Sequence, residues 1–144
     1  MYQLDGQLGC GDNKVTEMIN QSSPIHVKAL SSAGIMVAEV SCGGAHTCVL
    51  DPSGRLYSFG RVLDGQLGVG GRILENDGVG TPQLVESLSN VQKVVCGAFH
   101  TAAITMDGSL YTWGKEDYGM LGHGACENQY VPRKVKGLEG YCIV

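Results

Sequence analysis

Two histidines stand at the same distance from a cysteine in two separate parts of the chain. His46 follows Cys42 by four residues, and His100 follows Cys96 by four residues. Two imidazoles and two thiolates are a donor set that tetrahedral zinc accepts, so these side chains would form a metal site if the fold brought them together. Whether they meet depends on the elements that carry them.

The segments that hold these residues are copies of one another. Residues 42–60 and 96–114 share a pattern at an offset of 96 − 42 = 54 residues. Each begins Cys-Gly-Xaa-Xaa-His-Thr, continues as an apolar run, turns at a segment with Asp and Gly, and returns with alternating polarity, which predicts a β-hairpin. Equivalent positions of a repeat lie on successive units and need not converge. We therefore interpret both histidines as scaffolding that ties a glycine turn to the next strand, and the sequence predicts neither a metal nor a cofactor.

A second motif, Gly-Xaa-Leu-Gly-Xaa-Gly, occurs three times, at residues 6–11, 65–70 and 119–124. Three glycines around one leucine predict a compact turn with one apolar anchor. A phosphate-binding loop would need a preceding strand and a following helix, and residues 65–70 lead into a polar loop instead. Variable loops follow at 12–23, 71–81 and 125–131, and Pro24, Pro82 and Pro132 then open short stretches that we predict to be strands.

Each repeat thus offers about four short strands, and no segment keeps a helical period over ten residues. The repeats extend over residues 6–64, 65–118 and, in part, 119–144. The positions predicted to be structural in every repeat are Gly6, Gly9, Gly65, Gly68, Gly119, Gly122, Cys42, His46, Cys96, His100, Gly60 and Gly114. Trp113 and its repeat partner Phe59 are predicted to end a strand inside the core.

The three motifs, in this order and spacing, resemble the regulator-of-chromosome-condensation repeat family over nearly the whole chain. The resemblance implies a seven-bladed β-propeller. We therefore expect an all-β fold, an incomplete β-propeller of four-stranded antiparallel blades, with two to three of seven blades in one partial domain, 1–144. This length predicts a fragment of a longer protein, and the open blade edges predict self-association when the fragment is expressed alone.

The charge composition limits the classes of partner that we expect. The chain has a net charge of −4 and no long basic run, which argues against nucleic acid. The small basic group Arg133, Lys134 and Lys136 leaves chromatin open as a weaker alternative. The sequence shows no signal peptide and no membrane span. Its six cysteines are interpreted as free thiols, which predicts an intracellular location, in the cytoplasm or the nucleus.

The sequence predicts no enzyme, because it contains no recognisable catalytic set. His123, which lies near Cys126, corresponds to Val69 and Cys10 in the other copies, which argues against a ligand role. The leading hypothesis is a non-catalytic protein-interaction scaffold whose loops bind a protein partner. The interaction residues predicted for it are Arg61, Asp64, Arg72, Glu75, Asp77, Glu116 and Asp117.

The family resemblance leaves two further functions open. One is part of a guanine-nucleotide exchange factor for a Ran-like small GTPase, although no loop matches that activity. The other is a propeller segment of a larger ubiquitin ligase or signalling protein.

Overall fold

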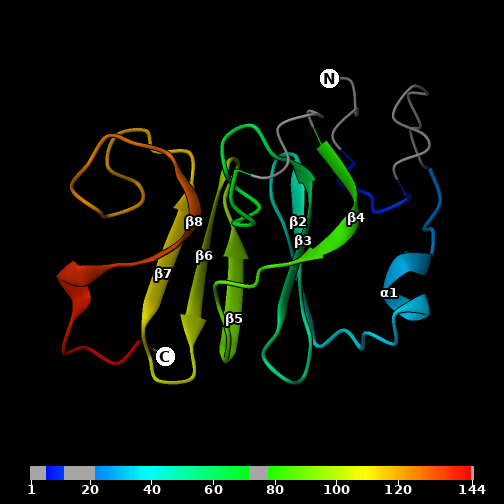
Figure 1. The fold of residues 1–144 in the computed structure, drawn as a ribbon, viewed down its shortest axis with the longest axis horizontal. Helices are drawn as coiled ribbons and strands as arrows, with labels where there is room; N and C mark the ends of the chain where they lie inside the picture. The colour runs from blue at the N-terminus through cyan, green and yellow to red at the C-terminus, as the bar shows by residue number, and fades with distance from the viewer. Residues whose placement is uncertain (1–5, 12–21, 72–77, 144) are drawn as a thin grey trace.

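The computed structural model describes residues 6–11, 22–71 and 78–143. Two four-stranded antiparallel sheets stand side by side, and in each sheet neighbouring strands follow chain order (Figure 1). The predicted all-β fold of four-stranded units is confirmed. The first sheet contains β1 (Glu39–Cys42), β2 (His46–Leu50), β3 (Leu56–Arg61) and β4 (Gly78–Leu84), and the second contains β5 (Val91–Cys96), β6 (His100–Thr105), β7 (Leu110–Gly114) and β8 (Gln129–Lys134).

The two predicted hairpins have the same register. His46 pairs with Gly60 in the first sheet, and His100 pairs with Gly114 in the second. Both glycines have positive φ, and a Cβ added to either would lie 2.6 Å from the Cα of the paired histidine. The cross-strand contact therefore requires glycine at this position in both copies.

The sheets do not coincide with the repeats defined from the sequence. The first sheet spans residues 39–84 and the second spans 91–134, whereas the sequence repeats were drawn as 6–64 and 65–118. The reason is that β4, which follows the second glycine motif, hydrogen-bonds back to β3 and completes the sheet of the preceding hairpin. Each sheet therefore takes its last strand from the next sequence repeat.

Pro82 and Pro132 lie within strands rather than at their start. β4 begins at Gly78 and β8 begins at Gln129, so Pro82 and Pro132 are internal and the predicted loops 71–81 and 125–131 extend too far. Both prolines are on the edge strand of their sheet, and the pairing register of that strand shifts near each of them. An edge strand with an irregularity tolerates a residue without an N–H.

The strand predicted after Pro24 is wrong. Residues 24–27 form no strand, and they lead into the short helix α1 (Lys28–Ser32). A strand here would need a hairpin to pair with, as β4 pairs with β3, and the residues described before Pro24 (6–11 and 22–23) form none. Helix α1 and the 3₁₀ helix η2 (Lys136–Leu138) are too short to show a helical period in the sequence. Among the described residues, no helix is long and apolar enough to cross a membrane.

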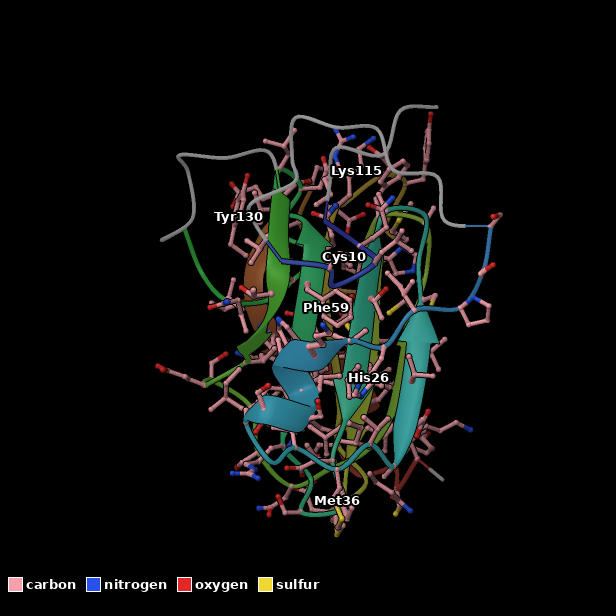
Figure 2. The ribbon with its side chains drawn as sticks, turned by 90° about the vertical axis from the view of Figure 1, so that its right-hand side faces the viewer. Cys10, His26, Met36, Phe59, Lys115 and Tyr130 are labelled. Atoms are coloured by element: carbon pink, nitrogen blue, oxygen red, sulfur yellow. The ribbon has the colours of Figure 1, made fainter. Side chains whose placement is uncertain are left out.

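The buried apolar side chains form two clusters. The larger one lies between the sheets and includes Trp113, which is 0% exposed. The smaller one lies under α1, near Phe59 in Figure 2, and contains Leu30, Val49, Tyr57 and Phe59. Trp113 and Phe59 are buried in a core, as predicted, and lie near the ends of equivalent strands rather than at their last residue. The members of the larger cluster are Cys48, Leu50, Leu56, Val85, Leu88, Val91, Val94, Ala103 and Trp113.

Candidate functional site

One end of the molecule presents an aromatic ring between two cations. Phe99, in the turn between β5 and β6, is 38% exposed. The guanidinium carbon of Arg61 lies 6.0 Å from the centroid of its ring, and Lys115 Nζ lies 5.6 Å from it. Arg61 and Lys115 occupy equivalent positions at the ends of β3 and β7, so both sheets contribute to this contact. Cations at such distances are attracted to the face of the ring.

Ion pairs and a second aromatic surround this ring. Lys115 Nζ lies 2.7 Å from Asp117 Oδ2, and Arg61 Nε lies 3.7 Å from Asp64 Oδ2. The hydrogen bond to Asp117 raises the pKa of Lys115. Tyr118, beside Asp117, is fully exposed at a positive φ of 60°. We call Arg61, Asp64, Phe99, Lys115, Asp117 and Tyr118 the Phe99 surface.

Glu116 does not share this surface, although the sequence pointed to it. Its side chain is buried, and its two carboxylate oxygens accept hydrogen bonds from the backbone N–H groups of Gly119 (2.6 Å) and Leu121 (3.1 Å). The Glu116 carboxylate therefore holds the third glycine turn against the end of β7. Its burial and this structural role keep the carboxylate inside the protein, away from a partner.

Sequence reasoning placed Arg61, Asp64 and Asp117 among the interaction residues, and the structure brings all three to the Phe99 surface. It missed Phe99 and Tyr118. The sequence could have indicated both, because Phe99 stands where the first repeat has Ala45 and Tyr118 stands where it has Asp64. A large aromatic side chain that is not repeated is not needed to build the repeat. The remaining predicted interaction residues lie outside the described part of the chain: Arg72, Glu75 and Asp77.

A second group of reactive side chains lies between the sheets. His46, Cys48 and Cys96 hold their donor atoms within 4.8 Å of one another. His46 and Cys96 therefore converge although they belong to different repeats, which the sequence interpretation did not expect. Within the described residues, Cys42 and His100 are not part of this group.

A chain of hydrogen bonds holds the ring of His46 at the junction, which is the contact between the two sheets. Its Nε2 lies 2.9 Å from Thr101 Oγ1. The Thr101 hydroxyl donates to the backbone oxygen of Gln66 (2.9 Å), so it accepts from Nε2, and Trp113 Nε1 donates to the same oxygen (3.0 Å). The histidine thus ties its own blade to a strand of the next one, while its buried Nδ1 has no hydrogen-bond partner among the described residues.

The two thiols of this group have opposite tendencies to ionise. The hydrogen bond from Cys48 lowers the pKa of Cys96; burial opposes this effect, and the neighbouring His46 adds to it. The pKa of Cys48 is raised by its hydrogen bond to Cys96 and by its complete burial. Cys96 is therefore the thiol of this pair that loses its proton first.

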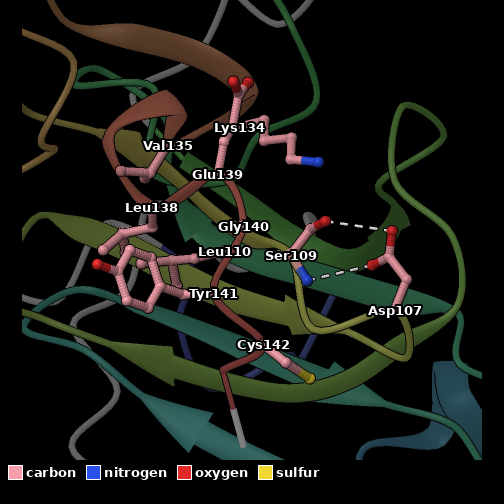
Figure 3. A pocket seen from close by; sticks show the side chains of 10 residues that line it. All are labelled: Asp107, Ser109, Leu110, Lys134, Val135, Leu138, Glu139, Gly140, Tyr141 and Cys142. Atoms are coloured by element: carbon pink, nitrogen blue, oxygen red, sulfur yellow. Dashed lines mark hydrogen bonds between the residues drawn. The ribbon is translucent and has the colours of Figure 1, made fainter.

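A pocket of about 370 Å³ lies beside the turn between β6 and β7 (Figure 3). Residues 138–142 form its other wall, and Ile143 N–H donates to the oxygen of Gly108. The equivalent bond in the first sheet joins Val91, where β5 begins, to Gly54. The pocket therefore lies on the second sheet at the position that, on the first sheet, is covered by the second sheet. Asp107 on its wall accepts hydrogen bonds from Thr105 and Ser109, so this carboxylate shapes the hairpin turn.

Comparison with known proteins identifies the repeat. The family model described as the regulator of chromosome condensation (RCC1) repeat matches residues 4–50, 53–104 and 107–144. The chain belongs to the RCC1 repeat family. It is 37% identical to human E3 ubiquitin-protein ligase HERC2 over 99% of its length and 43% identical to the probable human E3 ubiquitin-protein ligase HERC4 over 96%. It spans only 3% and 12% of the length of these two proteins.

The fold matches solved RCC1 propellers. The structure of Kap60 bound to yeast RCC1 (Prp20) superposes with a TM-score of 0.77 at 20% identity, covering 94% of this chain and 32% of the other. Prp20p from Saccharomyces cerevisiae, described together with its binding to Gsp1p and histones, gives a TM-score of 0.72 at 22% identity, covering 93% and 32%. The RCC1-repeat chain is therefore an incomplete β-propeller, and its two sheets are blades.

Proposed function

We propose that this RCC1-repeat segment is a non-catalytic protein-interaction module that binds a protein partner through the Phe99 surface. The observation that carries the proposal is the exposed Phe99 ring between Arg61 and Lys115, one cation from each blade. Each cation is anchored on a different blade, contacts the ring and pairs with an aspartate, and these contacts restrain the surface before a partner binds. Preorganisation lowers the entropy that binding costs.

The chemistry of the surface suits a protein partner. Tyrosine and arginine are enriched among the residues that dominate binding energy at interfaces, and phenylalanine is enriched at interfaces generally. Tyr118 and Phe99 offer apolar area, while Asp64 and Asp117 surround it with charge. The ion pairs are exposed enough to exchange partners at modest cost, because surface pairs contribute about 0–1 kcal/mol.

A photo-cross-linking experiment tests the proposal. A benzophenone amino acid replaces Phe99 in one version and Met106 in another, and both are expressed in the cells from which the sequence comes. Met106 is the matched control, because it is 66% exposed at the opposite end of β6. We expect position 99 to yield a defined protein adduct that position 106 does not yield.

A charge-reversal variant sharpens this experiment. Lys115→Glu removes one of the two cations beside the ring and should reduce the adduct at position 99 by about tenfold, which corresponds to about 1.4 kcal/mol. Lys93→Glu, which changes an exposed lysine on β5, should leave it unchanged. An identical adduct pattern at positions 99 and 106, or insensitivity to Lys115→Glu, would contradict the proposal.

A second candidate function is nucleotide exchange on a Ran-like small GTPase. Its support is the fold similarity to Prp20p, described with its binding to Gsp1p. Since this chain covers about a third of that protein, the assay uses the longest native protein that contains the segment. Release of a fluorescent GDP from the GTPase is measured with and without it. Acceleration that Phe99→Ala abolishes would favour the exchange factor, whereas the interaction-module proposal expects no acceleration.

The third candidate is a propeller segment of a longer ubiquitin ligase or signalling protein, supported by the identity to HERC2 and HERC4. Sequencing the transcript on both sides of the segment tests it directly, because a ligase domain would be encoded there. A reducing intracellular compartment also remains our proposal. Its support is that Cys48 and Cys96, whose thiols are neighbours at the contact between the blades, form no disulfide.

A further inference from the structure

We propose that His46, Cys48 and Cys96 form a binding site for one thiophilic d¹⁰ metal ion, Zn²⁺ or Cu⁺, between the two blades. Thiolate sulfur with imidazole nitrogen is the donor set that these ions prefer. The site would join the blades, because His46 and Cys48 come from β2 of the first and Cys96 comes from β5 of the second. These strands are neighbours in the structure (Figure 1).

The distances are close to those of a loaded site. The three donor atoms lie within 4.8 Å of one another. Zinc binds sulfur at about 2.3 Å and nitrogen at about 2.0–2.1 Å, which separates bound donors by roughly 3.5–4 Å. Closure around an ion therefore requires side-chain movements of about 1 Å or less, which rotation of the two thiols supplies.

The junction holds the donors in place. The His46 ring is 1% exposed and is oriented by the Thr101 hydroxyl, in the way that a second hydrogen bond orients metal-binding histidines. Since Nε2 is engaged by Thr101, the buried Nδ1, which has no hydrogen-bond partner among the described residues, is the nitrogen left to bind an ion. Cys96 is anchored by the bond from its backbone N–H to Ser41 Oγ (2.9 Å). Partial exposure of Cys96 gives an ion access from solvent.

Internal comparison shows which donor is special to this site. His46 and Cys96 have equivalents in the other repeat, His100 and Cys42, and their presence is explained by the scaffold. Cys48 corresponds to Ala102, so its thiol is not needed to build the strand. The thiol at position 48 converts a structural His–Cys contact into a set of three donors.

The two thiolates offset the charge of the metal ion, so the buried site carries little net charge. Zn²⁺ with two thiolates and a neutral imidazole is neutral overall, and Cu⁺ with the same ligands carries one negative charge. Three protein ligands complete a trigonal Cu⁺ site, whereas Zn²⁺ takes a water on the exposed side of Cys96 as its fourth ligand. Binding releases the proton of each thiol that was protonated, so no redox step is involved.

The test is an anaerobic titration of the full 144-residue chain, kept reduced with a phosphine. Zn²⁺ and Cu⁺ are each titrated in competition with a chromophoric chelator, and Co²⁺ serves as a spectroscopic probe through its sulfur charge-transfer absorption. We expect one equivalent of Zn²⁺ or Cu⁺ to bind. The ion that binds more tightly identifies the site.

Two matched variants decide the assignment. Cys48→Ala copies the residue of the second repeat and should fold normally, yet it should weaken binding by about 100-fold or more, because losing even a hydrogen-bond partner of a metal ligand costs 10–100-fold. Cys42→Ala removes an exposed cysteine outside the group and should bind as the wild type does. His46→Gln retains an amide donor for Thr101 and should also weaken binding.

Three results would overturn the proposal. The first is the absence of stoichiometric binding of either ion to the folded wild type. The second is equal affinity in Cys48→Ala. The third is loss of binding in Cys42→Ala with binding retained in Cys48→Ala. Circular dichroism of each variant verifies that it is folded before the titration.

Discussion

His46 and His100 are the same residue of the same motif, and the structure gives them different surroundings. The His46 ring is buried, and it bonds to Thr101 of the next blade. The ring of His100 is partly exposed, and it forms no side-chain hydrogen bond with the described residues. The difference is that the second blade covers the first, whereas no further blade among the described residues covers the second. The motif on one blade is thus completed by its neighbour.

The glycine turns show the same dependence on a neighbour. Gly68 packs on Trp113 of the second blade, and its equivalent Gly122 faces only the tip of Val135. The backbone conformation is the same in both, with φ of 72°. Local sequence therefore sets the shape of the turn, and the adjacent blade sets how tightly it is packed.

The largest expected effect is at Trp113, the centre of the junction. Trp113→Ala removes a completely buried side chain and should lower the free energy of unfolding by about 3–5 kcal/mol. Met106→Ala, at a position 66% exposed, should change it by less than about 0.5 kcal/mol. Urea denaturation followed by circular dichroism measures both. Similar losses in the two variants would show that the junction does not stabilise the fold.

The next effect separates turn strain from packing. Alanine at either Gly68 or Gly122 incurs the left-handed backbone cost of about 1–2 kcal/mol. At Gly68, the added Cβ also meets Trp113 Nε1 at 2.6 Å, which should add about 1–3 kcal/mol. Gly68→Ala should therefore be clearly less stable than Gly122→Ala in the same denaturation assay. Equal stability of the two variants would contradict the packing difference between the blades.

A smaller, pH-dependent effect is expected at the hairpin turn of the first blade. Burial alone would raise the pKa of Asp51, but hydrogen bonds from Ser53 and Arg55 outweigh it and lower the pKa to about 2. Since the folded-state pKa lies below the unfolded value, the carboxylate stabilises the fold above pH about 4. That contribution is lost as the pH falls from about 4 through about 2.

Asp51→Asn tests this effect by chemical denaturation at several pH values. The variant should be less stable than the wild type at pH 6, and the gap should narrow as the pH approaches 2. Asp107→Asn, in the exposed turn of the second blade, is the control and should show a smaller gap at pH 6. A gap for Asp51→Asn that stays constant with pH would exclude a stabilising role for its ionised form.

Much of the fold was predictable from the sequence because the two copies of the repeat can be compared position by position. The paired hairpins at 42–60 and 96–114, the turn glycines and the buried Trp113 all followed from matching positions. The pairing of the strands that contain Pro82 and Pro132 could not be predicted in this way. Which hairpin β4 joins depends on contacts between residues far apart in the sequence, and local patterns do not encode such contacts. The helix α1 was too short for periodicity to detect.

The site was less predictable, for a related reason. Arg61, Asp64 and Asp117 were found as charged residues in variable loops, but the same argument misplaced Glu116, whose carboxylate bonds to backbone N–H groups inside the protein. The convergence of Cys48 with Cys96 depends on how two blades pack. A contact between repeats can be inferred only once the rotation between the repeats is known.

The most direct test of the claim that one blade completes the motif of another is a double-mutant cycle on His46 and Thr101. His46→Ala, Thr101→Val and the double variant are compared by urea denaturation, with His100 and Thr47 as the matched control pair. We predict a coupling free energy of about 0.5–1.5 kcal/mol for His46 with Thr101 and none for His100 with Thr47. Strict additivity at His46 and Thr101 would contradict it.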